Sequence, residues 1–399
     1  MSRLLIIVLI FILSSTHLQA QKSSKDSLWS IWNSTTNADS EKLKAINVLA
    51  KNVYLYTVPD SSYLCTELQL EKAIDTKNDI QIANAYNTQG VIYALKSDYL
   101  NSFNHFEKSL VLSEKINYEK GIASSLNNLG LLKKRQGKYT EAIDFFTKSL
   151  EINEKIKDDK NTASCLNNIG IIFRDQNELE RAKHYFEKSL AINRLIDYKL
   201  GVASCLNNIG LIYSKQENLP LAIKYYKNSL EIVTEIGDKN RIAASLNNIG
   251  EIYFSYDSLA LSKDFFIRSL QLKKEASNNQ GVAVSMINLG MVSEKLEKYD
   301  ESINIYKEAL EIANSVNAHN EVKDAAFKLQ HIYKERGNYE DAFKMYELYI
   351  KKKNELSSIE VQKAVLDKEW EYKFDKKELA DSLETIRKEK ISLLSQEKE

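Results

Sequence analysis

A glycine recurs every forty residues through most of this 399-residue chain. The recurring positions are Gly90, Gly130, Gly170, Gly210, Gly250 and Gly290, and four of them end the phrase Leu-Asn-Asn-(Leu or Ile)-Gly. A fixed period of about 20 to 50 residues is typical of solenoids, in which each unit buries its apolar face on its neighbours. The chain is therefore a tandem repeat, and such stacks usually work as extended binding surfaces.

Each repeat contains two segments with helical periodicity. In the repeat at 121–160, apolar and small residues follow helical spacing over 122–135 and again over 139–156. A Gln-Gly-Lys connection joins the two segments, and its Gly137 can adopt the positive φ that ends a helix. The whole chain has only two prolines, which favours long helices. The pattern predicts two antiparallel helices per repeat.

The recurring glycine lies inside the first helix of each pair, where glycine costs about 1 kcal/mol relative to alanine. We therefore expect the second helix to approach Gly130 closely, with Ala142 against the glycine and Phe146 filling the space beyond. The small position is Ala142, Ala182, Ala222, Ser262, Ser302 and Ala342, and the bulky position is Phe106, Phe146, Phe186, Tyr226, Phe266, Tyr306 and Tyr346.

This arrangement resembles the tetratricopeptide repeat, a helix-turn-helix family with a glycine and a small residue at the helix contact. The forty-residue period is similar to the longer variety found in kinesin light chains and bacterial signalling proteins. The resemblance implies an all-α, right-handed superhelix (α-solenoid) of about eight repeats with a C-terminal helix. Repeats are expected near 41–80, 81–120, 121–160, 161–200, 201–240, 241–280, 281–320 and 321–360, after a cap segment at 21–40.

Several positions depart from the family pattern. The aromatic residue expected three places after the glycine is replaced by Lys133 and Ser293 in two repeats. The first repeat has Ala50 in place of glycine and Pro59 at its turn, which suits a terminal cap. We expect the apolar residues of 28–32 to lie on that cap.

The two asparagines of each Leu-Asn-Asn phrase belong to two neighbouring rows on the first helices. The resemblance places these rows on the concave side of the superhelix. The candidate ligand-binding rows are Asn87, Asn127, Asn167, Asn207 and Asn247, and beside them Asn128, Asn168, Asn208, Asn248 and Asn288. One turn further, Leu131, Ile171 and Leu211 form an apolar stripe. Carboxamides suit the alternating N–H and C=O groups of an extended peptide. Alternatively, the asparagines bond to neighbouring repeats and only stiffen the stack.

Charged residues vary along the same face. Lys134, Arg135 and Arg174 lie near its middle, whereas Glu251, Glu294 and Asp324 lie towards its C-terminal end. One hypothesis is a peptide or protein ligand with an acidic segment at one end and a basic segment at the other. The alternative is ordinary solvated charge.

Neither composition nor motifs indicate catalysis or nucleic-acid binding. The 55 basic and 55 acidic residues balance, so no global field attracts nucleic acid. The sequence contains no phosphate-binding glycine loop, His-Glu-x-x-His or Gly-x-Ser-x-Gly motif. The histidines outside the N-terminal segment share no helical face. We therefore expect a binding protein that is no enzyme and uses no cofactor.

The three cysteines are expected to be buried free thiols. Cys165 and Cys205 occupy equivalent places in successive repeats, about 10 Å apart, which exceeds the ~7 Å that a disulfide tolerates. No partner stands near them at metal-ligand spacing, so no metal site is expected.

Residues 1–20 have the form of a secretory signal peptide. Arg3 precedes an apolar run from Leu4 to Leu13, and Leu18-Gln19-Ala20 suits signal peptidase. That run is too short to span a hydrocarbon core of ~30 Å. We expect export to the periplasm or the medium and no membrane span elsewhere in this chain; the alternative is an uncleaved N-terminal anchor.

Residues 361–399 predict a charged C-terminal helix. Five apolar residues near its start, between Val365 and Phe374, suit a cap on the last repeat. Leu379, Ile386 and Leu393 then recur every seven residues, a short heptad pattern that suggests self-association through a coiled coil. The alternative function is accordingly the sensory ectodomain of a membrane histidine kinase or transcriptional regulator, with output through this helix.

The signal-peptide assignment predicts a defined mature N-terminus. When the full chain is expressed in a bacterial host, we expect the exported form to begin at Gln21 and to lack residues 1–20. Intact-mass analysis of the periplasmic fraction measures this directly. A protein that keeps Met1 and sediments with membranes would favour the anchor.

Overall fold

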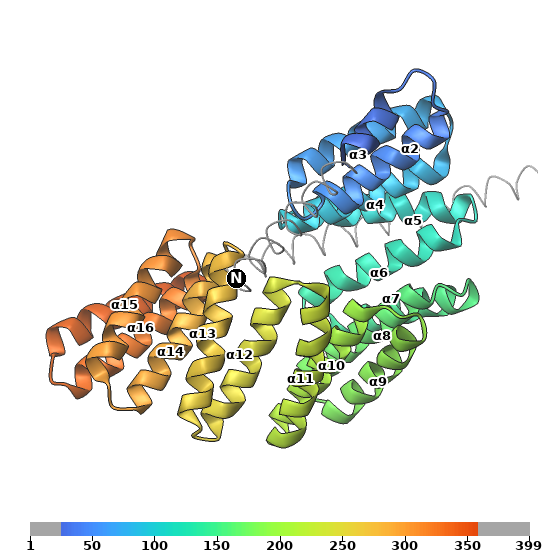
Figure 1. Cartoon of the computed structure of the whole chain (residues 1–399). Helices are drawn as coiled ribbons and strands as arrows, with labels where there is room; N and C mark the ends of the chain where they lie inside the picture. Colours follow the sequence, from blue (N-terminus) through green and yellow to red (C-terminus); the bar gives the residue numbers. More distant parts are fainter. Residues whose placement is uncertain (1–24, 358–399) are drawn as a thin grey trace, which may run out of the picture. The chain divides into compact units, whose positions relative to one another are not determined.

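A computed structural model describes residues 25–357, and every regular element within this range is a helix (Figure 1). The chain divides into two compact units, residues 1–172 and 173–399. The expected signal peptide at 1–20 and charged helix at 361–399 lie outside the described residues. None of the described helices is long and apolar enough to cross a membrane.

The helices follow one another at a nearly constant spacing. The first unit contains a helix over 25–33, α2 (Asp39–Val48), the π-helical η1 (Leu49–Tyr54), α3 (Pro59–Asp75), α4 (Asp79–Leu95), α5 (Tyr99–Lys115), α6 (Glu119–Arg135), α7 (Tyr139–Lys155) and most of α8 (Asp159–Asp175). The second contains α9 (Leu179–Leu195), α10 (Lys199–Lys215), α11 (Leu219–Ile236), α12 (Lys239–Ser255), α13 (Leu259–Glu275), α14 (Asn279–Lys295), α15 (Tyr299–Ser315), α16 (His319–Glu335) and a helix over 339–357.

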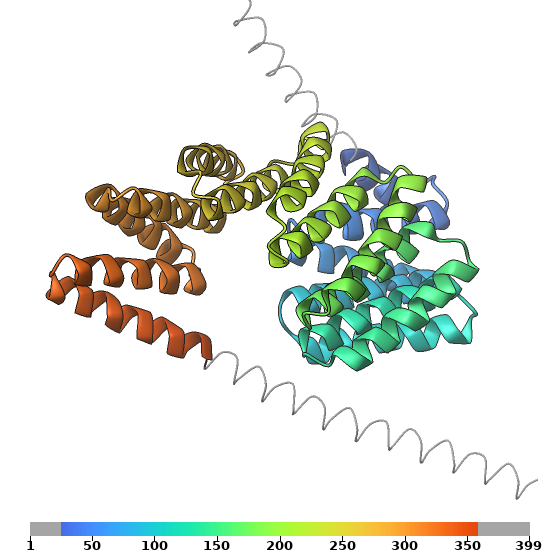
Figure 2. The same cartoon turned by 90° about the horizontal axis from the view of Figure 1, so that it is seen from below.

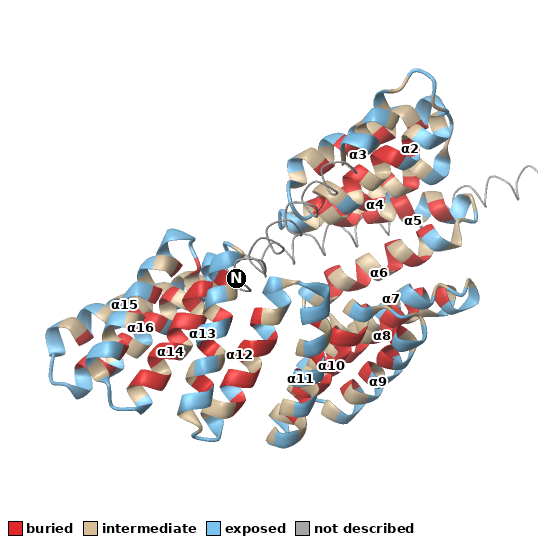
Figure 3. Cartoon of the chain, viewed as in Figure 1, coloured by how far each residue is buried: buried red, intermediate tan, exposed pale blue. Residues whose placement is uncertain are grey.

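Within each unit, a helix packs against the helices before and after it in the chain, in antiparallel orientation (Figures 1 and 2). Buried residues line the sides of the helices that face these neighbours (Figure 3). The structure therefore confirms an all-α solenoid built from helix-turn-helix repeats. The first helices of successive pairs, such as α4 and α6 or α12 and α14, also contact each other directly.

The turns between helices repeat one conformation every twenty residues. The second residue after most helix ends has positive φ, whereas after α11 it is the first, Gly237. This residue is glycine at Gly137, Gly237 and Gly337 and a residue such as Lys157 or Glu297 in the other turns of the series. The following residue is the N-cap of the next helix and is often Asn or Asp, whose side chain accepts a hydrogen bond from the backbone N–H three residues along.

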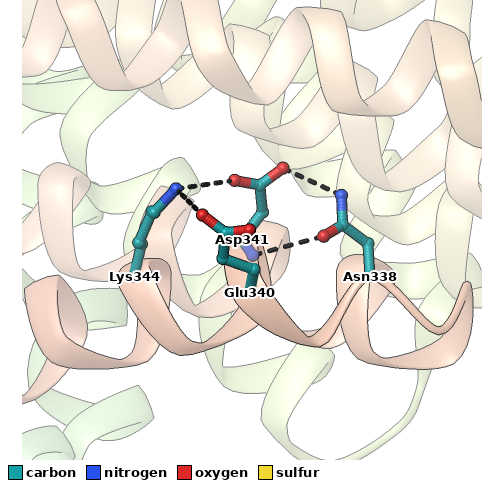
Figure 4. Close-up of polar contacts among 4 residues, drawn as sticks. All are labelled: Asn338, Glu340, Asp341 and Lys344. Atoms are coloured by element: carbon teal, nitrogen blue, oxygen red, sulfur yellow. Dashed lines mark hydrogen bonds and ion pairs between the residues drawn. The ribbon is translucent and has the colours of Figure 1, made fainter.

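The last described turn illustrates this cap (Figure 4). Asn338 Oδ1 accepts a hydrogen bond from the backbone N–H of Asp341 at 3.3 Å, and Asn338 Nδ2 donates to Asp341 Oδ2 at 2.8 Å. Lys344 Nζ donates to Glu340 Oε1 at 2.7 Å one turn further. The first of these contacts satisfies a backbone donor that a helix start otherwise leaves open, so the short connection fixes where this helix begins.

The recurring glycines contact an aromatic ring of the next helix, which corrects one detail of the sequence interpretation. A Cβ added to Gly130 would lie 2.8 Å from two ring carbons of Phe146, and one added to Gly290 would lie 2.4 Å from Tyr306. The nearest atoms belong to the ring and not to the small residue at position 142. A flat ring lies over the glycine Cα because no side chain keeps it away.

In three pairs the small residue contacts the glycine's backbone. Where it is serine, its hydroxyl donates to the carbonyl of that glycine: Ser102 to Gly90 at 2.8 Å, Ser262 to Gly250 at 2.9 Å and Ser302 to Gly290 at 3.0 Å. In the first repeat Ser62 donates likewise to Ala50 at 2.8 Å. These bonds satisfy hydroxyl groups that are fully buried between two helices.

The positions that depart from the family's aromatic pattern have polar contacts instead. In three repeats the aromatic residue stacks on a ring of the second helix, as Tyr213 does on Tyr225 with ring centroids 5.3 Å apart. Lys133 is buried and pairs with Glu141 at 2.5 Å, and Ser293 Oγ donates to Glu301 at 3.2 Å. In both repeats, the replacement residue thus connects the first helix of its pair to the second through an acidic residue of the second helix.

All three cysteines are buried and free. Cys165 Sγ donates to Ser149 Oγ at 3.3 Å, and Cys205 Sγ donates to Ser189 Oγ at 3.2 Å. Burial raises the pKa of the Cys65 thiol to about 11 and raises the pKa of the other two as well. The cysteines therefore serve as small core residues.

The segment before the first repeat covers its apolar face. Leu28, Trp29 and Trp32 pack against buried residues of α2, η1 and α3, including Ile46 and Cys65. Trp29 Nε1 donates to the hydroxyl of Tyr54 at 3.0 Å, which orients the indole at the edge of this cluster.

The glycine contact predicts that Gly130→Ala destabilises the protein although alanine is the better helix former. Overpacking typically costs about 1–3 kcal/mol and the gain in helix propensity is about 1 kcal/mol, so we expect a net loss of up to about 2 kcal/mol. Urea unfolding followed by circular dichroism measures it. In a double-mutant cycle with Phe146→Leu, the two effects should be coupled by about 1 kcal/mol. A stabilising Gly130→Ala, or strictly additive effects, would show that the ring does not restrict this position.

Candidate functional site

Asparagine side chains connect the first helices of successive pairs. In each pair, the Nδ2 group of the later asparagine donates to Oδ1 of an asparagine in the preceding repeat. The pairs are Asn128 to Asn87 at 3.0 Å and Asn168 to Asn127 at 3.1 Å in the first unit, and Asn248 to Asn207 and Asn288 to Asn247, both at 3.0 Å, in the second. In each unit, we call the surface that carries these pairs and the residues one turn further along the first helices the asparagine face. Those further residues are Leu131 and Ile171 in the first unit and Leu211, Glu251 and Met291 in the second.

These pairs use only part of the hydrogen-bonding capacity of the carboxamides. Asn127, Asn128, Asn207 and Asn248 are half-buried, not enclosed. Within the described chain, Oδ1 of Asn128 and Asn248 accepts no side-chain hydrogen bond. Asn87 and Asn247 are more enclosed, with 5% and 7% of their surface exposed, and they donate onward to Ser125 and Glu251. The hydrogen bonds between repeats that we considered as the alternative to ligand binding are therefore present. Carboxamide oxygens that could accept a hydrogen bond from a ligand remain on the same face.

The apolar stripe runs beside the asparagines and is interrupted once. Leu131, Ile171 and Leu211 are half-buried at equivalent positions of successive repeats. The next two repeats have Glu251 and Met291 there. A carboxylate thus occupies a position that is apolar in the three repeats before it.

The basic residues of the sequence hypothesis have different surroundings. Lys134 is half-buried and Arg135 exposed in the first unit. Arg174, in the second unit, donates to Oδ1 of Asn208 at 3.2 Å and pairs with Asp175 at 2.8 Å. Arg174 therefore contacts a row asparagine. Asn167 and Asn208 are half-buried like the other row members.

A cavity opens on the asparagine face of the second unit. Its volume is ≈ 220 Å³, and it is lined by Glu251, Phe254 and Ser255 of α12, Phe266 of α13, and Asn288 and Met291 of α14. Glu251 Oε1 accepts a hydrogen bond from Asn247 Nδ2 at 2.7 Å. Glu251 is exposed as a residue, yet desolvation by the surrounding protein raises the pKa of its carboxyl group.

Lys273 of α13 is a buried cation that sequence reasoning did not identify. Only 8% of its surface is exposed, and it makes no ion pair with a described residue. Burial lowers the pKa of its ammonium group to about 8, and the charge of Glu251 opposes this shift. Its stem lies against Gly281, where an added Cβ would meet Lys273 Cδ at 2.8 Å. One feature of the sequence could have indicated this buried side chain, namely a second series of glycines at 121, 201 and 281. Each of these glycines leaves space for a side chain of the preceding helix, at positions 113, 193 and 273 respectively.

The two other acidic residues of the hypothesis are engaged locally. Glu294 Oε2 accepts a hydrogen bond from the Tyr306 hydroxyl at 2.7 Å, and Glu294 Oε1 lies 3.8 Å from His331 Nδ1. Asp324 lies 3.4 Å from the neighbouring Lys323. In the described part of the chain, no group of three or more His, Cys, Asp or Glu side chains could hold a metal ion.

Stacked helix pairs, glycine-to-ring contacts and a polar face on the first helices together define a helical repeat protein of the binding type. The tetratricopeptide repeat model matches residues 81–155, 121–194, 201–275 and 281–353, more than half of the chain. The chain belongs to the tetratricopeptide repeat family. No curated protein shows significant sequence similarity to it.

Solved structures share the fold at low sequence identity. Aspartyl phosphate phosphatase F from Bacillus subtilis is 14% identical, with a TM-score of 0.57 over 84% of this chain and 93% of that one. The Rap conjugation gene regulator of the plasmid pLS20, in complex with the Phr* peptide, is 14% identical, with a TM-score of 0.54 over 85% and 95%. A Rap protein complexed with competence and sporulation factor is 14% identical, with a TM-score of 0.50 over 80% and 99%.

Burial of Lys273 predicts a pH-dependent stability difference. The ordinary pKa of 10.5 applies to the unfolded chain and the value of about 8 to the folded one, so between these values the unfolded chain binds more protons and stability rises with pH. Below pH 8 the full cost of burying the cation is present. We expect Lys273→Met to raise the free energy of unfolding at pH 7 by up to about 3 kcal/mol, and this gain to shrink towards pH 10.5.

Urea unfolding at pH 7 and pH 10 of the parent and the variant measures this difference. The matched control is Lys274→Met, because Lys274 is the exposed neighbour on the same helix. Equal effects of the two substitutions, or a gain that does not depend on pH, would contradict burial as the cause.

Proposed function

We propose that this protein is an exported, non-enzymatic scaffold that binds an extended peptide or protein segment along its asparagine face. The observation that carries the proposal is the partial use of the carboxamides. Each pair satisfies one donor and one acceptor, while Oδ1 of Asn128 and Asn248 accepts nothing from the described chain. They occupy equivalent positions in two repeats, one in each unit, whereas the equivalent oxygen of Asn208 accepts from Arg174. A peptide N–H can donate to such an oxygen.

Extended peptides match this surface better than compact ligands. A peptide backbone offers an N–H donor and a C=O acceptor at every residue other than proline, and a solenoid offers matching groups at every repeat. The apolar stripe of Leu131, Ile171 and Leu211 lies beside the carboxamides and suits alternate side chains of such a ligand. Two structural neighbours are described as complexes with a peptide or with a sporulation factor, which supports the same ligand class.

The proposal predicts that removing whole asparagine pairs abolishes binding but spares the fold. The variant replaces Asn127, Asn168, Asn207 and Asn248 with alanine, so that both partners of a pair leave together and no partner is left unpaired. We expect at least a tenfold loss of affinity for peptides that the parent selects from a displayed random library, measured by fluorescence anisotropy. The free energy of unfolding should change by about 1 kcal/mol or less per pair.

The control variant changes four exposed residues of the second helices to alanine, namely Glu151, Lys188, Glu231 and Glu311. It should bind the selected peptides as the parent does. Undiminished binding by the asparagine variant would restrict the asparagines to an architectural role, and a parent that selects no peptide would refute the proposed function.

A further inference from the structure

The cavity at Glu251 interrupts the apolar stripe in a specific way. Its carboxylate projects from α12 at the position that holds leucine or isoleucine in the three preceding repeats. Replacing an apolar side chain by a carboxylate in partly desolvated surroundings is unfavourable unless another group compensates the charge. The raised pKa of Glu251 shows that the compensation by its own surroundings is incomplete.

Neutral groups hold the carboxylate in place. Asn247 donates to Glu251 Oε1 at 2.7 Å, and Asn288, whose amide also donates to Asn247, supports the carboxylate from α14. Glu251 makes no ion pair with any lysine or arginine of the described residues. The charge of the buried Lys273 lowers the pKa of Glu251 and so opposes its desolvation, but the two groups form no ion pair among the described residues. An oriented carboxylate without a contacting cation therefore borders the cavity.

The rest of the cavity lining suits a flat, weakly hydrated cationic group. Phe254 provides an aromatic surface, the almost fully buried Phe266 closes the cavity floor, and Met291 provides a polarisable thioether. Lys295 already places its ammonium 4.9 Å from the centre of the Phe254 ring while pairing with Asp257 at 2.9 Å, so this ring does accept a cation. At ≈ 220 Å³ the cavity is smaller than the ~300 Å³ at which small-molecule pockets begin, so its size fits one side chain.

We infer that the Glu251 cavity receives an arginine or lysine side chain of the bound peptide. This inference rests on the proposed function. A guanidinium group can donate two hydrogen bonds to the carboxylate and stack on a phenylalanine ring at the same time, which favours arginine over lysine. An acidic side chain would be repelled, and an aliphatic one would desolvate Glu251 without pairing it. The cavity thus sets the residue preference at one position of the ligand.

The experiment selects peptides from a displayed random library with four forms of the full mature chain. They are the parent, Glu251→Gln, Glu251→Leu and the control Glu231→Gln, which neutralises an exposed carboxylate on α11. Leucine occupies the equivalent position in two other repeats, so Glu251→Leu is compatible with the fold. Circular dichroism and thermal unfolding check that all four are folded.

We expect the parent and Glu231→Gln to select peptides with arginine or lysine at one fixed position, and Glu251→Leu to select an apolar residue there. Replacing that arginine by citrulline, its uncharged analogue, should weaken binding to the parent at least tenfold and binding to Glu251→Gln less than twofold. Peptides enriched without a cationic position, or an equal citrulline effect in both proteins, would overturn the inference and leave peptide binding intact. If the parent enriches no peptide, both proposals fail.

Discussion

The contact between a glycine of one helix and an aromatic ring of the next determines how each helix pair packs. The added Cβ would stand 2.5 Å from Phe106 at Gly90 and 2.7 Å from Phe266 at Gly250, so only glycine allows this approach without a shift. The aromatic residue and the small residue lie one turn apart on the second helix and therefore on the same face. The ring covers the glycine's Cα, and a serine at the small position donates to its carbonyl. Repetition of this contact every forty residues keeps equivalent faces of the first helices in register within each unit, and the asparagine pairs depend on that register.

The asparagine pairs combine two roles that the sequence presents as alternatives. A carboxamide has two donor hydrogens and one oxygen with two lone pairs. One hydrogen and one oxygen of each pair suffice to connect neighbouring repeats, so the same residues that stiffen the array still present acceptors on its surface. A binding surface built this way is preorganised, because its polar groups are already oriented before a ligand arrives. This is the physical reason for expecting asparagine, and not a longer polar side chain, in these rows.

The fold was predictable because its determinants are local and repeated. The forty-residue period, the helix pair and the burial of the free cysteines all follow from spacing, and the structure confirms them. The neighbour of Gly130 was predicted incorrectly as Ala142, since spacing along a helix does not show which of two residues a turn apart the ring plane covers. Lys273 was missed because its surroundings come from separate helices, and a lysine in a charged stretch of sequence does not differ from an exposed one. Its small partner, Gly281, was the only local sign.

Glu251 and Lys273 are the two places in the second unit where a charge replaces the residue that packing alone would favour. The three repeats before Glu251 hold leucine or isoleucine at its position, and the position of Lys273 holds serine, asparagine, valine or alanine in the other repeats from 113 to 313, while the equivalent Lys353 is exposed. A sequence that specifies its fold consistently elsewhere tends to violate local rules where function requires it. Lys273 has no acidic partner at contact distance, so its burial lowers the free energy of unfolding. For Glu251 the carboxylate borders a cavity, is held by two amides and faces aromatic surfaces, so a ligand can recover the cost. The difference between the two sites is access to a partner, and access is what distinguishes a recognition site from a strained core residue.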